Sequence, residues 1–232
     1  PHNMMCMRDA CPDIVSFGAL VKRNPEGLLS LRESGITSPS LLAGRRVGIG
    51  PSPVSRAQFE LFLRANGLAR ENVEIVTVGF EGEELLLAGK IDALDAVAYA
   101  IPRTRRKGCE TDFLFYADSG LPDSPFLVFV ARADWLEANL AHARAFLEEA
   151  AASFPVVEAW GTAEWQRYVQ DLPGRNAEEE KEVWDATLPL MKGTGSLFRQ
   201  DREALRGLYR ILLERGSIRS PFAVDEAFRD IL

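Results

Sequence analysis

The stretch from Leu41 to Ala93 constrains the fold more than any other part of this chain. Its sequence is LLAGRRVGIGPSPVSRAQFELFLRANGLARENVEIVTVGFEGEELLLAGKIDA. A short apolar strand at 46–49 leads into a Gly-Pro-Ser-Pro loop. An amphipathic helix, an alternating strand at 73–78, a second short helix and an apolar run from Ile91 then follow. This alternation is typical of a parallel α/β sheet with ligand-binding loops at the carboxyl ends of its strands.

The segments on the two sides of this block differ in character. Apolar runs predict further strands at 13–21, 112–117 and 126–131, and residues 27–34 read as a short helix. The run at 13–21 is apolar on both faces, which suits a central parallel strand. Beyond residue 131 no strand pattern of comparable strength appears. Four helices are expected there, at 134–153, 162–171, 177–190 and 200–215.

This change of character, together with turn-rich segments at 37–44 and 118–125, predicts two lobes. Residues 44–124 are expected to form the lobe that carries the βαβαβ block. Residues 1–43 and 125–232 are expected to form the other lobe, which is discontinuous in sequence and ends in a helical tail.

The charge balance argues against a broad nucleic-acid-binding role. The chain has 27 Lys and Arg against 34 Asp and Glu, a net charge of −7, whereas nucleic-acid binding usually needs a basic face. The one basic cluster, at 103–107, is interpreted as a solvated helix end and not as a phosphate clamp. No apolar run approaches the roughly 20 residues of a membrane span. No signal-peptide pattern is visible in this chain.

Residue types that serve catalysis or metal binding are scarce. The three cysteines, Cys6, Cys11 and Cys109, include no C-x-x-C pair, so free thiols and no zinc site are expected. The two histidines, His2 and His142, lie far apart in the sequence and leave little material for a His-based centre. The P-loop, G-x-G-x-x-G, G-x-S-x-G and H-E-x-x-H motifs do not occur. We therefore expect no enzyme activity, no metal and no cofactor.

The loop from Gly50 to Ser55 is the first candidate ligand-binding segment. It lies between a strand and the start of a helix expected from Arg56, where free backbone N–H groups and the helix dipole suit an anionic or hydrogen-bond-accepting group. Gly50, Pro51, Ser52 and Ser55 are the candidate residues, and the two serines add hydroxyl donors. The alternative is that Ser55 serves only as the N-cap, with proline as helix starter.

Three further residues are candidates for ligand contacts. The segment 91–99, IDALDAVAY, predicts a strand that carries Asp95 and Tyr99 toward the same edge. A tyrosine ring stacks on planar ligands, and a carboxylate accepts from a ring amino group. Asp118 lies in the turn-rich segment 116–125, where it either faces the ligand or forms a hinge turn through its side chain.

Four segments resemble a known family when they are taken in order. They are GLLSLRESGITSPSLLAGRRVGIG, VTVGF…LLLAGKIDA, DSGLPDSPFLVFVARADWLEANLAHARAFLEEA and LERGSIRSPFAVDEAFRDIL. Each is similar to a segment of the type II periplasmic solute-binding proteins that carry thiamine pyrimidine precursors, with relatives for nitrate, sulfonates and taurine. The resemblance runs from about Pro12 to the end of the chain.

The resemblance implies an α/β, type II periplasmic binding protein-like fold of two lobes with parallel-rich sheets and a helical C-terminal tail. Family members carry a further strand-helix stretch before the part that matches this chain, so lobe one is expected to be incomplete and a homodimer is one way to cover it. The implied function is the solute-binding component of an ABC-type importer. Its ligand would be a thiamine pyrimidine precursor or a similar planar or anionic metabolite.

The same resemblance implies an ABC permease subunit as partner and an extracytoplasmic location, in the periplasm or lipid-anchored at the cell surface. Two alternatives remain at this point. One is the ligand-sensing effector domain of a transcription regulator. The other is a relative of thiamine-pyrimidine biosynthesis enzymes, although the Cys-rich motif of those enzymes is absent from this chain.

Overall fold

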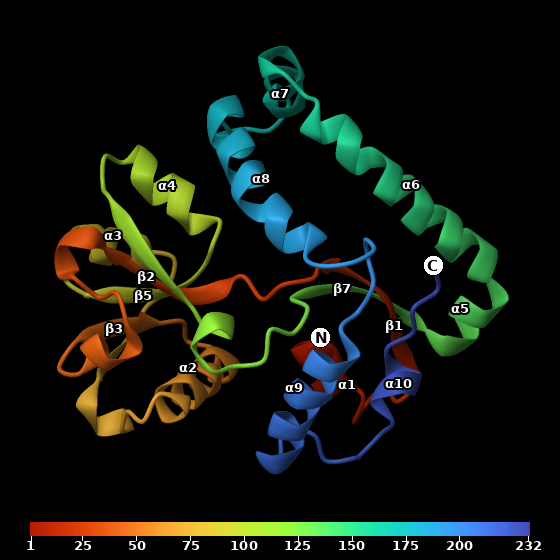
Figure 1. Cartoon of the computed structure of the whole chain (residues 1–232), viewed down its shortest axis with the longest axis horizontal. Helices are drawn as coiled ribbons and strands as arrows, with labels where there is room; N and C mark the ends of the chain where they lie inside the picture. The colour runs from red at the N-terminus through yellow and green to blue at the C-terminus, as the bar shows by residue number, and fades with distance from the viewer. The chain divides into compact units, whose positions relative to one another are not determined.

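A computed structural model describes all residues, 1–232, and separates the chain into two units (Figure 1). Both units are discontinuous in sequence. Unit 1 comprises Pro1–Asn24, Pro122–Glu178 and Leu188–Leu232. Unit 2 comprises Pro25–Leu121 and Glu179–Thr187. No helix in the chain combines the length and the apolar character needed to cross a membrane.

Unit 2 is built on a five-stranded sheet with the order β4-β3-β5-β2-β6. The strands are β2 Glu26–Leu31, β3 Arg46–Ile49, β4 Glu74–Thr77, β5 Ala93–Val97 and β6 Thr111–Phe115. Strands β3, β4 and β5 run parallel, and β2 runs antiparallel to both β5 and β6. The carboxyl ends of β3, β4, β5 and β6 therefore meet at one edge of the sheet, which we call the carboxyl edge.

Three helices cover the two faces of this sheet. They are α2 Pro53–Ala65, α3 Gly82–Leu87 and α4 Ala100–Arg106. Helix α2 buries Phe59, Phe62 and Leu63 against Leu28 of β2 and Val47 of β3, because residues three and four apart share one helix face. Helices α3 and α4 pack on the opposite face. The predicted βαβαβ block is confirmed, with helix α2 beginning three residues earlier than expected.

Strand β2 corrects the helix predicted at 27–34. It pairs with β5 on one side and with β6 on the other, so it is an interior strand of the sheet. Gly27 marks a close approach of two backbones: a Cβ atom there would lie 2.3 Å from the carbonyl oxygen of Leu114. The sheet is consequently mixed and less parallel-rich than expected. A lobe boundary at residue 44 would leave one of its strands out.

Unit 1 contains a two-stranded antiparallel sheet of β1 Ile14–Val21 and β7 Leu127–Arg132. The expectation of a central parallel strand at 13–21 is therefore wrong. An antiparallel strand can also be apolar on both faces when helices and loops cover it. The register of β1 shifts between Ser16 and Gly18 and again between Ala19 and Val21, which is the signature of β-bulges.

The remaining helices lie after β7, apart from one at the start of the chain. They are α1 His2–Met7, α5 Ala133–Ala138, α6 Leu140–Glu158, α7 Thr162–Val169, α8 Ala177–Lys192, α9 Arg202–Glu214 and α10 Val224–Ala227. The predicted helical tail is confirmed. The single helix predicted at 134–153 is divided into α5 and α6, which meet at Asn139. The N-cap residue of α5 is Arg132, and Asp134 lies in its first turn.

The C-terminal part of the chain covers the second edge of β1. The backbone N–H of Ala19 donates to the carbonyl of Phe198 at 2.8 Å, and that of Arg229 donates to the carbonyl of Ser16 at 2.7 Å. This edge is therefore not bare. A homodimer that covers unit 1 stays a prediction.

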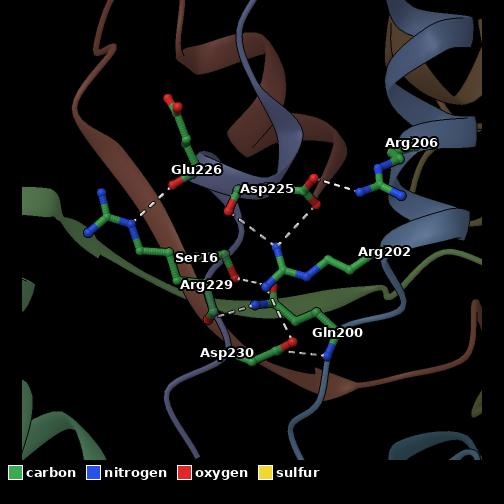
Figure 2. A network of polar contacts seen from close by, with 8 residues as sticks. All are labelled: Ser16, Gln200, Arg202, Arg206, Asp225, Glu226, Arg229 and Asp230. Atoms are coloured by element: carbon green, nitrogen blue, oxygen red, sulfur yellow. Dashed lines mark hydrogen bonds and ion pairs between the residues drawn. The ribbon is translucent and has the colours of Figure 1, made fainter.

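A buried polar network fixes this arrangement (Figure 2). Gln200 lies at its centre and is 1% exposed. Its Oε1 accepts from the Ser16 hydroxyl at 2.5 Å, and its Nε2 donates to the carbonyl of Arg229 at 3.0 Å. Asp230 accepts from the backbone N–H of Gln200 at 3.0 Å and pairs with Arg202 at 3.2 Å. One side chain thus ties the chain end to the first strand.

Candidate functional site

Three loops meet at the carboxyl edge of unit 2. They follow β3 at Gly50–Ser52, β4 at Val78–Glu81 and β5 at Ala98–Tyr99. The strand order β4-β3-β5 places the loop after β3 between the other two. Adjacent strands lie about 4.8 Å apart, so the outer loops leave their strands about 10 Å from each other. Ligands of open α/β sheets bind at this kind of edge.

Ser52, and not Ser55, is the N-cap of helix α2. Its backbone is extended, its Oγ accepts from the N–H of Val54 at 3.2 Å, and Pro53 is the first helical residue. The prediction that the helix starts at Arg56 with Ser55 as cap is therefore wrong. The proline at the first position explains the earlier start, because proline is favoured at N1. Pro51 and Ser52 are exposed to solvent, and Gly50 beside them is half-buried.

Asp95 lies inside β5, opposite Leu28, and its side chain points toward helix α2. The Tyr116 hydroxyl donates to Asp95 Oδ1 at 2.7 Å. Burial raises the pKa of Asp95 to about 7 against the opposing effect of this hydrogen bond, and the charge of Glu26 adds to the rise. Strand β5 ends at Val97, so Tyr99 follows the strand and does not share it with Asp95 as predicted.

Two further polar residues complete a group that sequence reasoning did not find. Gln58 Nε2 on α2 donates to Glu26 Oε2 at 2.7 Å. Glu26 stands opposite Val97 in the register of β2 and β5, next to the carboxyl edge. We call Glu26, Gln58, Asp95 and Tyr116 the polar cluster. The sequence gives no signal for Glu26, because the pattern of the residues that follow it predicts a helix. Gln58 gives no signal of its own either, because a single polar residue beside the buried Phe59 is ordinary in an amphipathic helix.

Tyr99 is the N-cap residue of α4 and is 42% exposed. The Arg103 guanidinium lies 5.4 Å from the centre of its ring, a cation–π distance, and so covers one ring face. Arg103 also pairs with Glu179 at 3.1 Å, and Arg106 with Glu182 at 3.0 Å. The basic cluster at the end of α4 is therefore paired with acidic side chains and does not form a phosphate clamp.

Asp118 is exposed in a short 3₁₀ turn, Ala117–Ser119. Asn66, just past the end of α2, donates from Nδ2 to the carbonyl of Ser119 at 2.8 Å. Ser52 caps the other end of this 13-residue helix, which is about 20 Å long. The structure thus places Asp118 apart from the loop after β3, and its ligand role stays a prediction.

The structure shows neither a metal-binding cluster nor a disulfide bond. No group of three or more His, Cys, Asp or Glu side chains is arranged to hold a metal ion. All three cysteines are free thiols, as predicted. The polar cluster brings two carboxyl groups, those of Glu26 and Asp95, near each other beside the carboxyl edge.

Comparison with known proteins places this architecture in a family. The family described as NMT1/THI5 like matches residues 1–154. A putative thiamine biosynthesis protein of Haemophilus influenzae is 24% identical over 181 residues, which cover 77% of this chain and 57% of that protein. The formylaminopyrimidine-binding protein of Halalkalibacterium halodurans is 25% identical over 126 residues, 53% of this chain and 38% of that protein. The chain thus spans about half the length of these relatives.

Solved structures agree on the fold. The periplasmic aliphatic sulphonate binding protein SsuA of Escherichia coli superposes with a TM-score of 0.69 at 16% identity over 96% of this chain and 75% of that one. The desulfurization enzyme DszB superposes with a TM-score of 0.55 at 15% identity over 98% and 80%. The expected type II periplasmic binding protein-like fold is confirmed. At these identities the likeness concerns the fold alone, which hosts binding proteins and an enzyme.

Proposed function

Because the chain belongs to the NMT1/THI5-like family, we propose that it is the solute-binding component of an ABC-type importer. The proposed ligand is a small planar metabolite, with a thiamine pyrimidine precursor as first candidate. An ABC permease is the partner, and the protein acts outside the cytoplasm. The observation that carries this proposal is the polar cluster beside the carboxyl edge of unit 2.

The polar cluster suits an aminopyrimidine. Such a ring presents a nitrogen acceptor next to an amino donor. A carboxyl group whose pKa is about 7, as burial makes that of Asp95, is populated in both protonation states near neutral pH. Its protonated form donates to the ring nitrogen while its other oxygen accepts from the amino group. Asp95 Oδ1 accepts from Tyr116, and no protein donor occupies Oδ2.

The neighbouring groups supply complementary contacts. The Glu26 carboxyl group, held by Gln58, is a second acceptor for an amino group. The loop after β3 offers the Ser52 hydroxyl and the first N–H groups of α2 to a carbonyl or anionic substituent. The exposed side of Tyr99 offers an aromatic surface. One relative is named for a formylated aminopyrimidine, which combines an amino-substituted ring with a carbonyl group.

Titration calorimetry with the 232-residue chain tests this function. We expect formylaminopyrimidine to bind, and pyrimidine without the amino group to bind at least tenfold more weakly, about 1.4 kcal/mol. Asp95→Ala should lower the affinity by a similar factor, because alanine offers neither the donor nor the acceptor. Asp112→Ala is the matched control, because Asp112 pairs with Ser30 near the amino end of β6, away from the carboxyl edge. Equal affinity of both pyrimidines would refute the assigned ligand class.

Recovery of the ligand after incubation separates capture from conversion. An importer component returns formylaminopyrimidine unchanged, which mass spectrometry of the released ligand would show. A product with a different mass would instead favour an enzyme, the activity of one protein that shares this fold. Fractionation of cells that carry the native gene would test the extracytoplasmic location.

A further inference from the structure

Phe80 is the most exposed large apolar side chain of the protein, with a relative exposure of 109%. It lies in the loop after β4, at the carboxyl edge of unit 2. A phenylalanine ring that contacts nothing forgoes the free energy that burial would provide. None of the groups assigned above to ligand binding includes it.

The loop that carries Phe80 is a tight and anchored turn. The N–H of Gly82 donates to the carbonyl of Gly79 at 3.3 Å, which places Phe80 at the second position of the turn. Glu81 Oε1 accepts from the N–H of Gly79 at 2.9 Å. Gly82 is buried, and a Cβ atom there would lie 2.8 Å from Leu94. The backbone thus holds the ring outward on a fixed support.

The strand order gives Phe80 a partner. Phe80 follows β4 and Tyr99 follows β5, with β3 and its loop Gly50–Ser52 between them. Strands two places apart are separated by about 10 Å. A planar ring between two aromatic side chains needs about 9–14 Å, because each stacked or edge-to-face pair has its centres about 4.5–7 Å apart. The spacing of the two strand ends matches this requirement.

The surroundings place no unpaired side-chain charge between the two aromatic residues. Arg103 covers one face of Tyr99, and its charge is paired with Glu179. The loop between the two aromatic side chains contains Gly50, Pro51 and Ser52, which carry no charge and leave room above the backbone.

We propose that Phe80 and Tyr99 hold the planar ring of the solute between them, above the loop Gly50–Ser52. This assignment rests on the proposed function and names its ring-contacting residues. A surface for the permease is the alternative use of an exposed phenylalanine, and the experiment separates the two.

The test compares Phe80→Ala, Phe80→Tyr and the control Phe146→Ala in the 232-residue chain. Phe146 is also exposed, at 50%, but lies on α6 of unit 1. The probes are formylaminopyrimidine and an aliphatic sulfonate without a ring. We expect Phe80→Ala to raise the Kd for formylaminopyrimidine about tenfold, because a stacking contact is lost. Phe80→Tyr and Phe146→Ala should stay close to the unmodified chain, and sulfonate binding should not depend on Phe80.

If the unmodified chain and Phe80→Ala bind formylaminopyrimidine with the same Kd, the ring contact is overturned and the proposed function is left intact. Unchanged Kd together with lost uptake in a reconstituted importer overturns it as well and assigns Phe80 to the permease. Binding of the sulfonate alone overturns the ring contact but keeps a solute-binding role. An unmodified chain that binds neither probe contradicts the proposed function, and this assignment with it.

Discussion

The Tyr116 hydroxyl donates a 2.7 Å hydrogen bond to Asp95 Oδ1 in the interior of unit 2. Tyr116 is 1% exposed, and its ring packs against Phe62 of α2 at 4.9 Å between centres. Burial raises the pKa of Tyr116 well above its ordinary value, so the hydroxyl stays protonated and remains a donor. This fixed donor holds Oδ1 as an acceptor, so the proton of the neutral carboxyl group belongs on Oδ2.

Asp95→Asn should stabilise unit 2, and the gain should grow with pH. Burial raises the pKa of Asp95 to about 7, whereas an unfolded aspartate titrates near ~3.9. Between these values the unfolded chain has released a proton that the folded chain keeps, so wild-type stability falls as pH rises from about 4 to 7. Asparagine keeps the acceptor for Tyr116 and removes the charge.

We expect the free energy of unfolding of Asp95→Asn to exceed that of the wild type by about 2–4 kcal/mol at pH 8. Near pH 4 the two free energies should differ little. Hydrogen exchange of the β5 amides reports this stability locally. Parallel pH profiles of the two proteins would contradict the raised pKa.

Asp92 connects the starts of two parallel strands through Arg46. Arg46 donates from Nη2 to Oδ1 at 2.9 Å and from Nε to Oδ2 at 3.1 Å, and its backbone N–H donates to Oδ2 at 2.8 Å. These hydrogen bonds hold the pKa of Asp92 below its usual value. The stability they provide is present above the unfolded pKa and is lost as pH falls through the folded value.

Asp92→Ala should therefore lower the Tm by a few degrees at pH 7, a typical effect of losing one such contact. The difference from the wild type should shrink as the pH is lowered below about 4, where the unfolded aspartate is protonated. A thermal unfolding series from pH 3 to 7 measures this. A Tm difference that does not change with pH would mean that the side chain acts through packing and not through its charge.

The local sequence pattern predicted much of unit 2. The apolar run of β3, the 3.6-residue repeat of α2 and the alternation around β4 each lie within a few residues. Strand β2 was misread because EGLLSL is buried at four successive positions, Gly27–Ser30. A short run that is apolar on all sides does not distinguish a strand from a helix. The antiparallel pairing of β1 was missed for a similar reason, since nothing local to 14–21 encodes its partner.

The candidate site also contains residues that local sequence predicts and residues that only the strand pairing brings together. The loop after β3 was found from a local strand-to-helix transition. Glu26 joins Asp95 only through the register of β2 with β5, and Tyr116 joins it through the fold of β6 beside them. Phe80 has no local signal, because one exposed aromatic residue in a loop resembles any other until the strand order is known.

Gly27→Ala should destabilise unit 2 strongly. A Cβ atom at this position would lie 2.3 Å from the carbonyl oxygen of Leu114 and 2.6 Å from the Phe113 ring, so β2 and β6 would have to separate. We expect a loss of about 3 kcal/mol or more, as in severe overpacking. Gly35→Ala is the comparison: its φ is +67° but the space around it is open, so the cost should be about 1–2 kcal/mol. The reverse ranking in urea unfolding would contradict the tight β2–β6 approach.

Gln200→Leu should destabilise unit 1 through two buried groups that lose their partner. The substitution removes the acceptor of the Ser16 hydroxyl, a residue that is 0% exposed, and the donor to the carbonyl of Arg229. A buried polar group without a partner costs about 1–3 kcal/mol, so we expect a loss of about 2–4 kcal/mol in all. Ser16→Ala in the same chain removes one of the two orphaned groups, and the double variant should recover about 1–2 kcal/mol relative to the sum of the single changes.

Tryptophan fluorescence during urea unfolding reports mainly on this unit, because three of the four tryptophans, Trp135, Trp160 and Trp165, belong to it. Strictly additive losses would mean that Ser16 and Gln200 are not coupled, and that backbone contacts alone hold the chain end against β1.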